Sequence, residues 1–175
     1  GAWRSRRLHF VDRSDLRPTP DRVRETLFNW LGQDLTGLQC LDLFAGSGAL
    51  GFEAASRGAA RVTLVERDSA AHASLTANRE ALGALRQVEV VRRDALEFLR
   101  SDTEQYHVIF LDPPFAQGYW EQLVPLLPPR MKPDAWVYYE AGEAPQWPAG
   151  WAVCKQGRAG QVLFQLVKRT QEISG

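Results

Sequence analysis

The segment Leu41-Asp42-Leu43-Phe44-Ala45-Gly46-Ser47-Gly48-Ala49-Leu50-Gly51 joins a short apolar run to a glycine pattern and then to helix-forming residues. A strand that leads into Gly-x-Gly-x-x-Gly and a helix is typical of nucleotide-binding corners in parallel α/β sheets. The glycines allow a tight turn, and the first turn of the helix presents free N–H groups. Alone, this pattern predicts a nucleotide-like cofactor without saying which one.

Two acidic residues narrow the choice of cofactor. Glu66 ends the next apolar run, about 20 residues on, where a carboxylate can accept hydrogen bonds from both ribose hydroxyls. Asp42 lies just inside the first strand, where a negative charge repels phosphates and attracts an ammonium or sulfonium group. Asp42 can also accept hydrogen bonds from nearby backbone amides, and the two roles are compatible. We therefore expect S-adenosyl-L-methionine rather than a dinucleotide.

The rest of the chain alternates short apolar runs with helical stretches, which predicts a mostly parallel sheet with helices on both faces. The last two runs are joined by Gly157-Arg158-Ala159-Gly160, too short for a crossover helix, so they should form an antiparallel hairpin. Such a seven-stranded sheet is typical of the Rossmann-like class I methyltransferases. The expected strands are Cys40–Phe44, Arg61–Glu66, Val88–Arg92, His107–Leu111, Ala135–Glu140, Trp151–Gln156 and Gln161–Lys168, and the expected helices are Gly48–Arg57, Ala70–Leu82, Ala95–Arg100 and Tyr119–Leu127.

The start of the chain is basic although the formal net charge of the whole chain is zero. Residues 1–24 contain seven arginines and three aspartates, which suits contact with nucleic-acid phosphates; a solvated, charged terminus is the alternative. We divide the chain into a basic arm, residues 1–18, for which a short hairpin is one expected form, and a methyltransferase domain, residues 19–175. Thr19 and Pro20 resemble an N-cap and a first-turn proline, and the apolar face of the helix that follows is Val23, Leu27, Trp30 and Leu31.

The motif Asp112-Pro113-Pro114-Phe115 directly follows the fourth expected strand. Ligands of open α/β sheets lie at the carboxyl ends of the strands, so this motif should lie beside the glycine turn. An exocyclic amine of a nucleobase is a poor nucleophile and needs acceptors for its two N–H groups. We expect Asp112 and the carbonyl of Pro113 to accept them and Phe115 to stack on a base turned out of its helix. A rigid loop with a turn aspartate is the alternative.

Asp94 follows the third expected strand and has Glu97 three residues later. This pair suits a helix N-cap, and Asp94 can also accept a hydrogen bond from the amino group of an adenine. The two cysteines, Cys40 and Cys154, are not in a metal-ligand spacing, so we expect no metal.

The motifs together resemble the RsmD family of bacterial 16S rRNA guanine-N2 methyltransferases. The resemblance covers nearly the whole chain and is strongest in residues 17–31, in the glycine segment and in Asp112-Pro113-Pro114-Phe115. It implies a guanine of 16S rRNA as the target, within a partly assembled 30S subunit. No apolar run is long enough to cross a membrane and no apolar signal region follows the basic start, so we expect a cytoplasmic enzyme, and we expect it to be a monomer. By the same resemblance, the cofactor-binding residues are Arg17, Thr19, Asp42, Phe44, Gly46, Gly48, Glu66, Arg67, Asp94 and Ala95, the catalytic residues are Asp112, Pro113, Pro114 and Phe115, and the RNA-binding residues are Arg4, Arg6, Arg7 and Arg22.

Other functions remain open on the residues alone. The same fold also carries amino-methyltransferases that act on DNA bases or on protein glutamine. An NAD-dependent oxidoreductase would account for the glycine pattern but not for Asp112-Pro113-Pro114-Phe115. A non-catalytic RNA-binding module would retain the basic arm without any need for Glu66 or Asp112.

Overall fold

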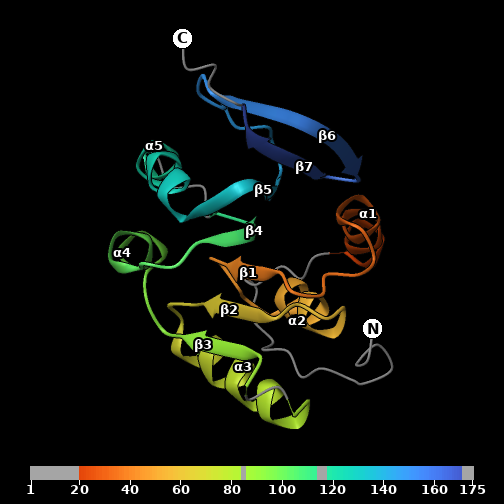
Figure 1. The fold of residues 1–175 in the computed structure, drawn as a ribbon, viewed down its shortest axis with the longest axis vertical. Helices are drawn as coiled ribbons and strands as arrows, with labels where there is room; N and C mark the ends of the chain where they lie inside the picture. Colours follow the sequence, from red (N-terminus) through yellow and green to blue (C-terminus); the bar gives the residue numbers. More distant parts are fainter. Residues whose placement is uncertain (1–19, 84–85, 114–117, 171–175) are drawn as a thin grey trace.

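A seven-stranded sheet in the order β3-β2-β1-β4-β5-β7-β6 forms the centre of the protein (Figure 1). The computed structural model describes residues 20–83, 86–113 and 118–170. Strands β1 to β5 are parallel to one another, and β7 is antiparallel to both β5 and β6. The strands are β1 (Gln39–Asp42), β2 (Arg61–Val65), β3 (Val88–Val91), β4 (Tyr106–Leu111), β5 (Met131–Ala141), β6 (Trp151–Ala159) and β7 (Val162–Arg169). The predicted mostly parallel sheet with a C-terminal antiparallel hairpin is confirmed.

Helices cover both faces of the sheet and form two separate cores. Helices α1, α2 and α3 pack on the face that carries Cys40, Phe110 and Tyr138, and helices α4 and α5 pack on the face that carries Leu41 and Tyr139. The helices are α1 (Asp21–Leu31), α2 (Ala49–Ser56), α3 (Ser69–Ala81), α4 (Ala95–Ser101) and α5 (Tyr119–Leu123), followed by the short 3-10 helices η1 (Val124–Leu126) and η2 (Pro128–Arg130). Successive side chains along a strand point to opposite faces of the sheet, so they contribute alternately to the two cores.

Helix α1 packs on the sheet through the face predicted from the sequence. Val23 and Leu27 are fully buried, and Trp30 packs against Phe164 of β7 with ring centroids 5.2 Å apart. Phe28 is also fully buried, because it fills the space between α1 and Phe110. This additional contact widens the apolar face beyond the predicted one.

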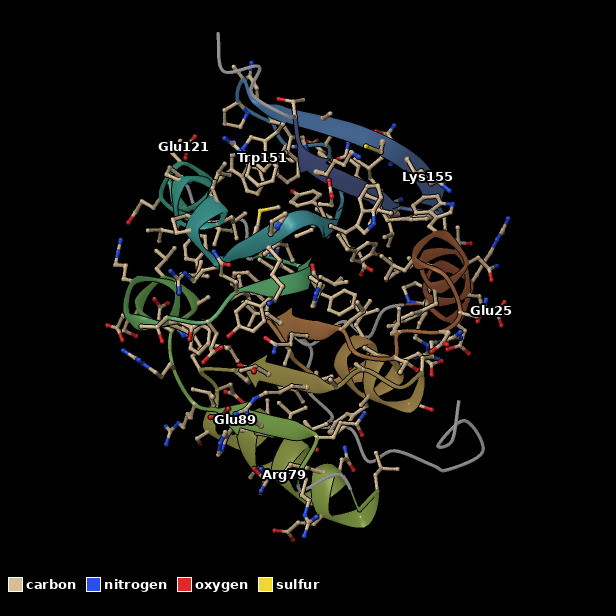
Figure 2. The ribbon with its side chains drawn as sticks, viewed as in Figure 1. Glu25, Arg79, Glu89, Glu121, Trp151 and Lys155 are labelled. Carbon is tan, nitrogen blue, oxygen red and sulfur yellow. The ribbon has the colours of Figure 1, made fainter. Side chains whose placement is uncertain are left out.

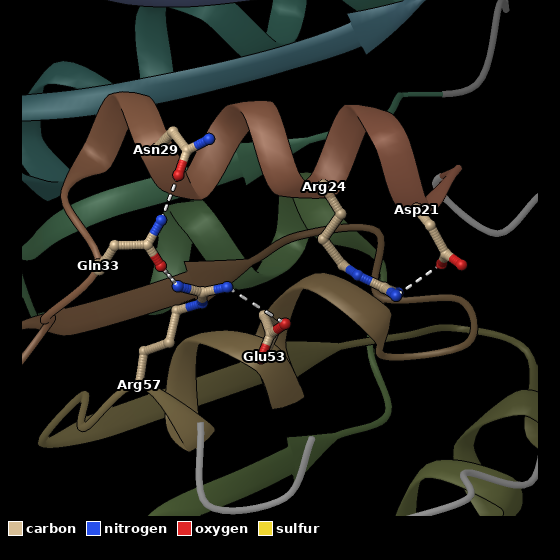
Figure 3. Close-up of polar contacts among 6 residues, drawn as sticks. All are labelled: Asp21, Arg24, Asn29, Gln33, Glu53 and Arg57. Atoms are coloured by element: carbon tan, nitrogen blue, oxygen red, sulfur yellow. Dashed lines mark hydrogen bonds and ion pairs between the residues drawn. The ribbon is translucent and has the colours of Figure 1, made fainter. Parts of the chain in front are cut away.

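Polar contacts fix α1 relative to α2 (Figure 3). Asn29 accepts a hydrogen bond from Gln33, which in turn accepts one from the guanidinium of Arg57. The same guanidinium forms an ion pair with Glu53, 3.5 Å away, and lies over the ring of Phe28. The position of α1 matters for function because the chain enters the domain through it.

The first turn of α1 differs from the prediction. Pro20 occupies the N-cap position with an extended ψ of 143°, and the helix begins at Asp21 rather than at the proline. The carbonyl of Pro20 accepts the first helical hydrogen bond from Arg24, so the proline starts the helix from outside it. Thr19, the predicted cap, lies outside the described residues.

Two predicted elements have different limits in the structure. The helix expected over 119–127 ends at Leu123 and continues as 3-10 turns, because Pro125 has no N–H for an α-helical hydrogen bond. Strand β5 begins at Met131, not at Ala135, since the irregular backbone at Asp134, with φ of 63°, lies inside the strand. The sequence Lys132-Pro133-Asp134 looks like a turn, and only the pairing of Tyr106 with Met131 extends the strand across it.

The C-terminal hairpin is longer than predicted. Strand β6 continues through Gly157 to Ala159, which leaves Gly160-Gln161 as a two-residue turn. A Cβ atom at Gly157 would lie 2.6 Å from the ring of Phe164, so this glycine serves packing rather than the turn. At the other end of β6, Trp151 extends the aromatic core on the side of α5 (Figure 2).

Candidate active site at the carboxyl edge of the sheet

Four carboxylates lie at the carboxyl ends of four neighbouring strands. Asp42 ends β1, Glu66 follows β2, Asp112 follows β4, and Glu140 is the second-last residue of β5. The strand register pairs Asp42 with Leu64 and with Phe110, and Phe110 with Tyr138. Glu66 lies two residues beyond Leu64, and Glu140 lies two residues beyond Tyr138. Because side chains alternate along a strand, these two acids point to the same face of the sheet as Asp42. The topology thus brings Asp42, Glu66 and Asp112 to one edge of the sheet.

The glycine turn lies directly against Glu66. The amide of Gly46 donates a hydrogen bond of 3.0 Å to Glu66 Oε1, and the amide of Asp68 donates one of 2.8 Å to Oε2. Gly46 and Gly48 both have positive φ, at 53° and 82°, which is the backbone that the tight turn requires. Each carboxylate oxygen keeps a second lone pair for another donor. Glu66 therefore holds the turn in place and remains chemically able to accept ribose hydroxyls.

The third glycine of the pattern brings helix α2 close to the sheet. A Cβ atom on Gly51 would lie 2.2 Å from Leu64 Cδ2, well inside van der Waals contact. The absence of a side chain lets the helix start immediately above β2, so its N-terminal amides face the edge where Asp42 and Glu66 lie.

Asp42 is almost completely buried, with 4% of its surface exposed. Burial raises the pKa of its carboxyl from 3.8 to about 8, a hydrogen bond from the backbone of Phe44 opposes the rise, and the charges of Asp112, Glu66 and Glu140 add to it. Such a group gains most when a cation approaches, because a positive charge stabilises its ionised form. The site is therefore suited to a ligand with a positively charged portion.

A second group of residues lies beside the glycine turn. Asp94 caps α4 by accepting a hydrogen bond of 3.1 Å from the amide of Glu97, which confirms the predicted cap. Tyr119 of α5 packs against Phe44, with ring centroids 6.0 Å apart. The pKa of Tyr119 is raised to about 12, first by burial and then by the charge of Asp94, whereas the charge of Arg67 lowers it.

These contacts bring together the residues predicted for one side of the cofactor. Phe44, Arg67 and Asp94 converge around Tyr119, and the buried Ala95 begins the adjacent helix. Tyr119 has no signal in the sequence, because only the path of the chain after Asp112 brings α5 to this position.

Asp112 and Pro113 occupy the predicted place after β4. Asp112 is partly exposed and Pro113 is buried. The charge of Asp112 raises the pKa values of Asp42 and of Tyr139, after burial in both cases, which places its carboxylate near the ends of β1 and β5. Pro114 and Phe115 lie outside the described residues.

Glu140 was assigned no role from the sequence. It is 5% exposed, and Tyr138, two residues earlier on β5, donates a hydrogen bond of 2.6 Å to its Oε1. Burial and then the charge of Glu140 raise the pKa of Tyr138 far above its usual range. The signal that was available is its position: like Asp42 and Glu66, it is an acid at the end of an apolar strand.

The remaining predicted site residues do not join this group in the described part of the chain. Arg22 is exposed on the first turn of α1. The predicted positions Arg4, Arg6, Arg7, Arg17 and Thr19, and the possible hairpin of the arm, lie outside the described residues.

The described residues contain neither a cluster of metal ligands nor a helix that could span a membrane. Within residues 20–83, 86–113 and 118–170, no group of three or more histidine, cysteine or acidic side chains is placed to hold a metal ion. None of the helices in these ranges combines the length and the apolar character that crossing a membrane requires.

Known proteins resemble this chain closely in sequence and in structure. Residues 1–168 match the family described as Conserved hypothetical protein 95. Ribosomal RNA small subunit methyltransferase D of Escherichia coli (strain K12) is 43% identical over 174 residues, which span 97% of this chain and 87% of that protein. The solved structure of Escherichia coli yhhF superposes with a TM-score of 0.86 at 40% identity and covers 98% of this chain and 96% of its own.

More distant structures share the fold alone. Precorrin-6y C5,15-methyltransferase of Geobacter metallireducens has a TM-score of 0.70 at 18% identity, with 90% of this chain and 92% of that one covered. The seven-stranded sheet with its terminal antiparallel pair is thus the fold of the class I methyltransferases.

Proposed function

The chain belongs to the RsmD family of methyltransferases, and from this premise we propose that it methylates the exocyclic N2 of a guanine in 16S rRNA. The observation that carries this proposal is the position of Asp112 and Pro113, at the end of β4 and beside Asp42 and the glycine turn. A methyl donor on the glycine side and an amine on the Asp112 side would meet between these two strand ends. The Escherichia coli relative, ribosomal RNA small subunit methyltransferase D, supports RNA of the small ribosomal subunit as the target.

The residues on the glycine side fit S-adenosyl-L-methionine. Asp42 provides a buried carboxylate for a positively charged amino-acid tail, and Glu66 provides lone pairs for ribose hydroxyls. Phe44, Arg67, Asp94 and Ala95 would enclose the adenine. Bound there, the donor supplies a methyl carbon whose bond to sulfur breaks as its bond to nitrogen forms, leaving S-adenosylhomocysteine.

The residues on the Asp112 side orient the amine. The carboxylate of Asp112 and the carbonyl of Pro113 accept one N–H each, which turns the nitrogen lone pair out of the plane of the base and towards the methyl carbon. The nitrogen becomes cationic as it is methylated, and it then loses one proton to water, which restores the neutral amine. Asp112 therefore acts by position and charge rather than as a strong base.

The nucleic acid would approach from the side of the N-terminal arm. Arg4, Arg6, Arg7 and Arg22 would pair with phosphates, and Arg17 and Thr19 would close over the bound donor. A site in a partly assembled 30S subunit gives such an arm several RNA segments to contact.

Labelled S-adenosyl-L-methionine tests the substrate. Naked 16S rRNA, 30S subunits from a strain that lacks the homologous enzyme, duplex DNA and a protein release factor are offered to the enzyme in parallel. We expect label in the 30S subunits, recovered after nuclease digestion as N2-methylguanosine. Label in DNA or in the release factor instead would identify one of the other amino-methyltransferase activities.

Replacing Asp112 separates chemistry from donor binding. Asp112→Ala removes an acceptor that acts on the amine, so kcat should fall by about 100-fold or more, while the Kd for S-adenosylhomocysteine should change less than about threefold. The matched control is Glu121→Ala, at an exposed acid on α5 (Figure 2), which should leave both quantities unchanged. Turnover of the Asp112 variant within a few-fold of the wild type would contradict the mechanism.

A further inference from the structure

Glu140 is the carboxylate at the edge of the sheet to which the proposed reaction gives no task. It lies on β5, the strand next to Asp112, and is 5% exposed. Leu111 pairs with Tyr139 in the parallel β4–β5 ladder, so the chain reaches Asp112 and Glu140 at the same height on neighbouring strands.

The side chain of Glu140 is held in one orientation. Tyr138 is completely buried and donates its hydroxyl hydrogen to Glu140 Oε1 at 2.6 Å. A carboxylate oxygen has two lone pairs, so this bond fixes the group without exhausting its acceptors. On the other side of β5, Glu140 pairs with Phe164 of β7, whose ring belongs to the same core.

The order of the strands defines a direction along the edge. It runs from Glu66 on β2 to Asp42 on β1, then to Asp112 on β4 and Glu140 on β5. In the proposed function the first two acids hold the ribose and the amino-acid tail of the donor, and Asp112 holds the amine. Glu140 therefore lies beyond the amine, on the side away from the donor, where the ring of the target base would be.

We propose that Glu140, oriented by Tyr138, accepts the N1–H of the target base and thereby selects guanine. Guanine carries two neighbouring donors on this edge, the ring N1–H and the exocyclic N2–H. Adenine and cytosine carry an unprotonated ring nitrogen beside their amine, which would face the carboxylate with a lone pair. This inference rests on the proposed function and specifies how its substrate is chosen.

The chemistry gives Glu140 a large effect on base choice. A base that lacks N1–H would turn the lone pair of its ring nitrogen towards a buried negative charge and would form no hydrogen bond there, so it is rejected more strongly than a surface contact could achieve. Glu140 would touch the base, whereas Tyr138 is a positioning residue that acts through Glu140.

A change of the target base tests the contact. In 2-aminopurine the exocyclic 2-amine is retained, whereas N1 carries no hydrogen and C6 carries no oxygen, so the contribution of N1–H is the part of the rate difference that a Glu140 substitution removes. The probes are 30S particles reconstituted with 16S rRNA that carries either guanosine or 2-aminopurine riboside at the methylated position, once that position is mapped. The wild-type enzyme should methylate the guanosine particles at least about tenfold faster than the 2-aminopurine particles.

Substitution of the acceptor should reduce this preference. Glu140→Gln replaces one carboxylate oxygen with an N–H donor, so the rate on guanosine particles should fall at least about tenfold and the ratio of the 2-aminopurine rate to the guanosine rate should rise by a similar factor. Tyr138→Phe should change the ratio in the same direction by a smaller factor. The matched control is Glu143→Gln, at an exposed acid three residues further on, which should leave the ratio unchanged.

The outcomes separate this inference from the proposed function. Equal wild-type rates on both particles, or a ratio that Glu140→Gln leaves unchanged, would overturn the role of Glu140 while the methyltransferase assignment stands. No methylation of the guanosine particles by the wild type would instead overturn the proposed function. The affinity of each variant for S-adenosylhomocysteine, expected within about threefold of the wild type, reports whether the fold is intact and does not depend on the target base.

Discussion

Asp42 illustrates at the scale of one residue how a binding site reduces the stability of the protein that contains it. Its carboxyl is buried beneath the glycine turn and close to three other acids, which raises its pKa to about 8. An unfolded chain would ionise the same group near 3.8. The contribution of Asp42 to stability is therefore complete below pH 4 and is lost as the pH rises towards 8, because the unfolded state releases the proton and the folded state retains it.

Asp42→Asn should remove this pH-dependent loss. Without a bound ligand, the melting temperature of the variant minus that of the wild type should be larger at pH 8 than at pH 5, by about 4 °C or more. The affinity for S-adenosylhomocysteine should fall at least about tenfold at pH 8, since the charge that pairs with the ammonium is gone. Thermal unfolding at both pH values and calorimetric titration measure the two effects. A difference in melting temperature that does not grow with pH would contradict the pKa.

The residues of the site were predictable where a pattern marks them. The spacing from the glycine pattern marked Glu66 as a site residue, and the position directly after the fourth expected strand marked Asp112. The spacing did not predict that both oxygens of Glu66 accept backbone amides, which depends on how the turn closes over β2. The sequence also assigned no role to Glu140, because Glu140 lies next to Asp112 only through the pairing of β4 with β5.

At the scale of elements, two helices on opposite faces of the sheet, α3 and α4, begin with capping aspartates. Asp68 accepts a hydrogen bond of 2.8 Å from Ala71 and caps α3, and Asp94 caps α4. Asp94 has a second, proposed task at the adenine of the donor, and Asp68 has none. The pair therefore allows the two tasks of Asp94 to be separated.

Asp94→Ser should keep the cap and lose the charge. Serine is a good N-cap residue, so the free energy of unfolding should change by less than about 0.5 kcal/mol, while the Kd for S-adenosylhomocysteine should rise about fivefold or more. Asp68→Ala, the matched control, should lower the free energy of unfolding by about 1 kcal/mol and leave the Kd nearly unchanged. Urea titration and calorimetry provide the measurements. An unaltered Kd for Asp94→Ser would show that the residue only caps α4.

The elements themselves followed from apolar runs and helix signals, and their limits did not. Pro125 shortened one helix, as its missing N–H requires, although the run of apolar residues continued past it. Gly157 looked like a turn residue and is part of β6, because its missing side chain makes room for the ring of Phe164. In each case the deciding contact comes from another part of the chain.

At the scale of the whole molecule, the positive charge lies at the two ends of the sequence. Residues 1–24 carry seven arginines and three aspartates, and the only charged residues from 144 to 170 are Lys155, Arg158, Lys168 and Arg169. The segment between them is acidic and contains all four carboxylates of the site. This distribution leaves the net charge at zero and still provides basic segments for RNA.

The arm should contribute to RNA binding through simple ion pairing. A variant with Arg4, Arg6 and Arg7 all replaced by Gln should bind 30S subunits more weakly, and the slope of log K against log salt should become less steep by about 2. Arg61→Gln, at the amino end of β2 and thus at the opposite edge of the sheet, is the control and should leave the slope unchanged. Filter binding at several salt concentrations measures the slope, and an unaltered slope would exclude phosphate contacts by the arm.

The antiparallel pair β6–β7 has a consequence for the synthesis of the protein. Strand β7 pairs with the side of β5 away from β4, and it is the last of the described strands to be made. Domains begin to fold while the ribosome is still elongating the chain, so β5 emerges with one side of its backbone unpaired. Translation that stops short of residue 162 would leave this strand edge exposed and the product prone to self-association.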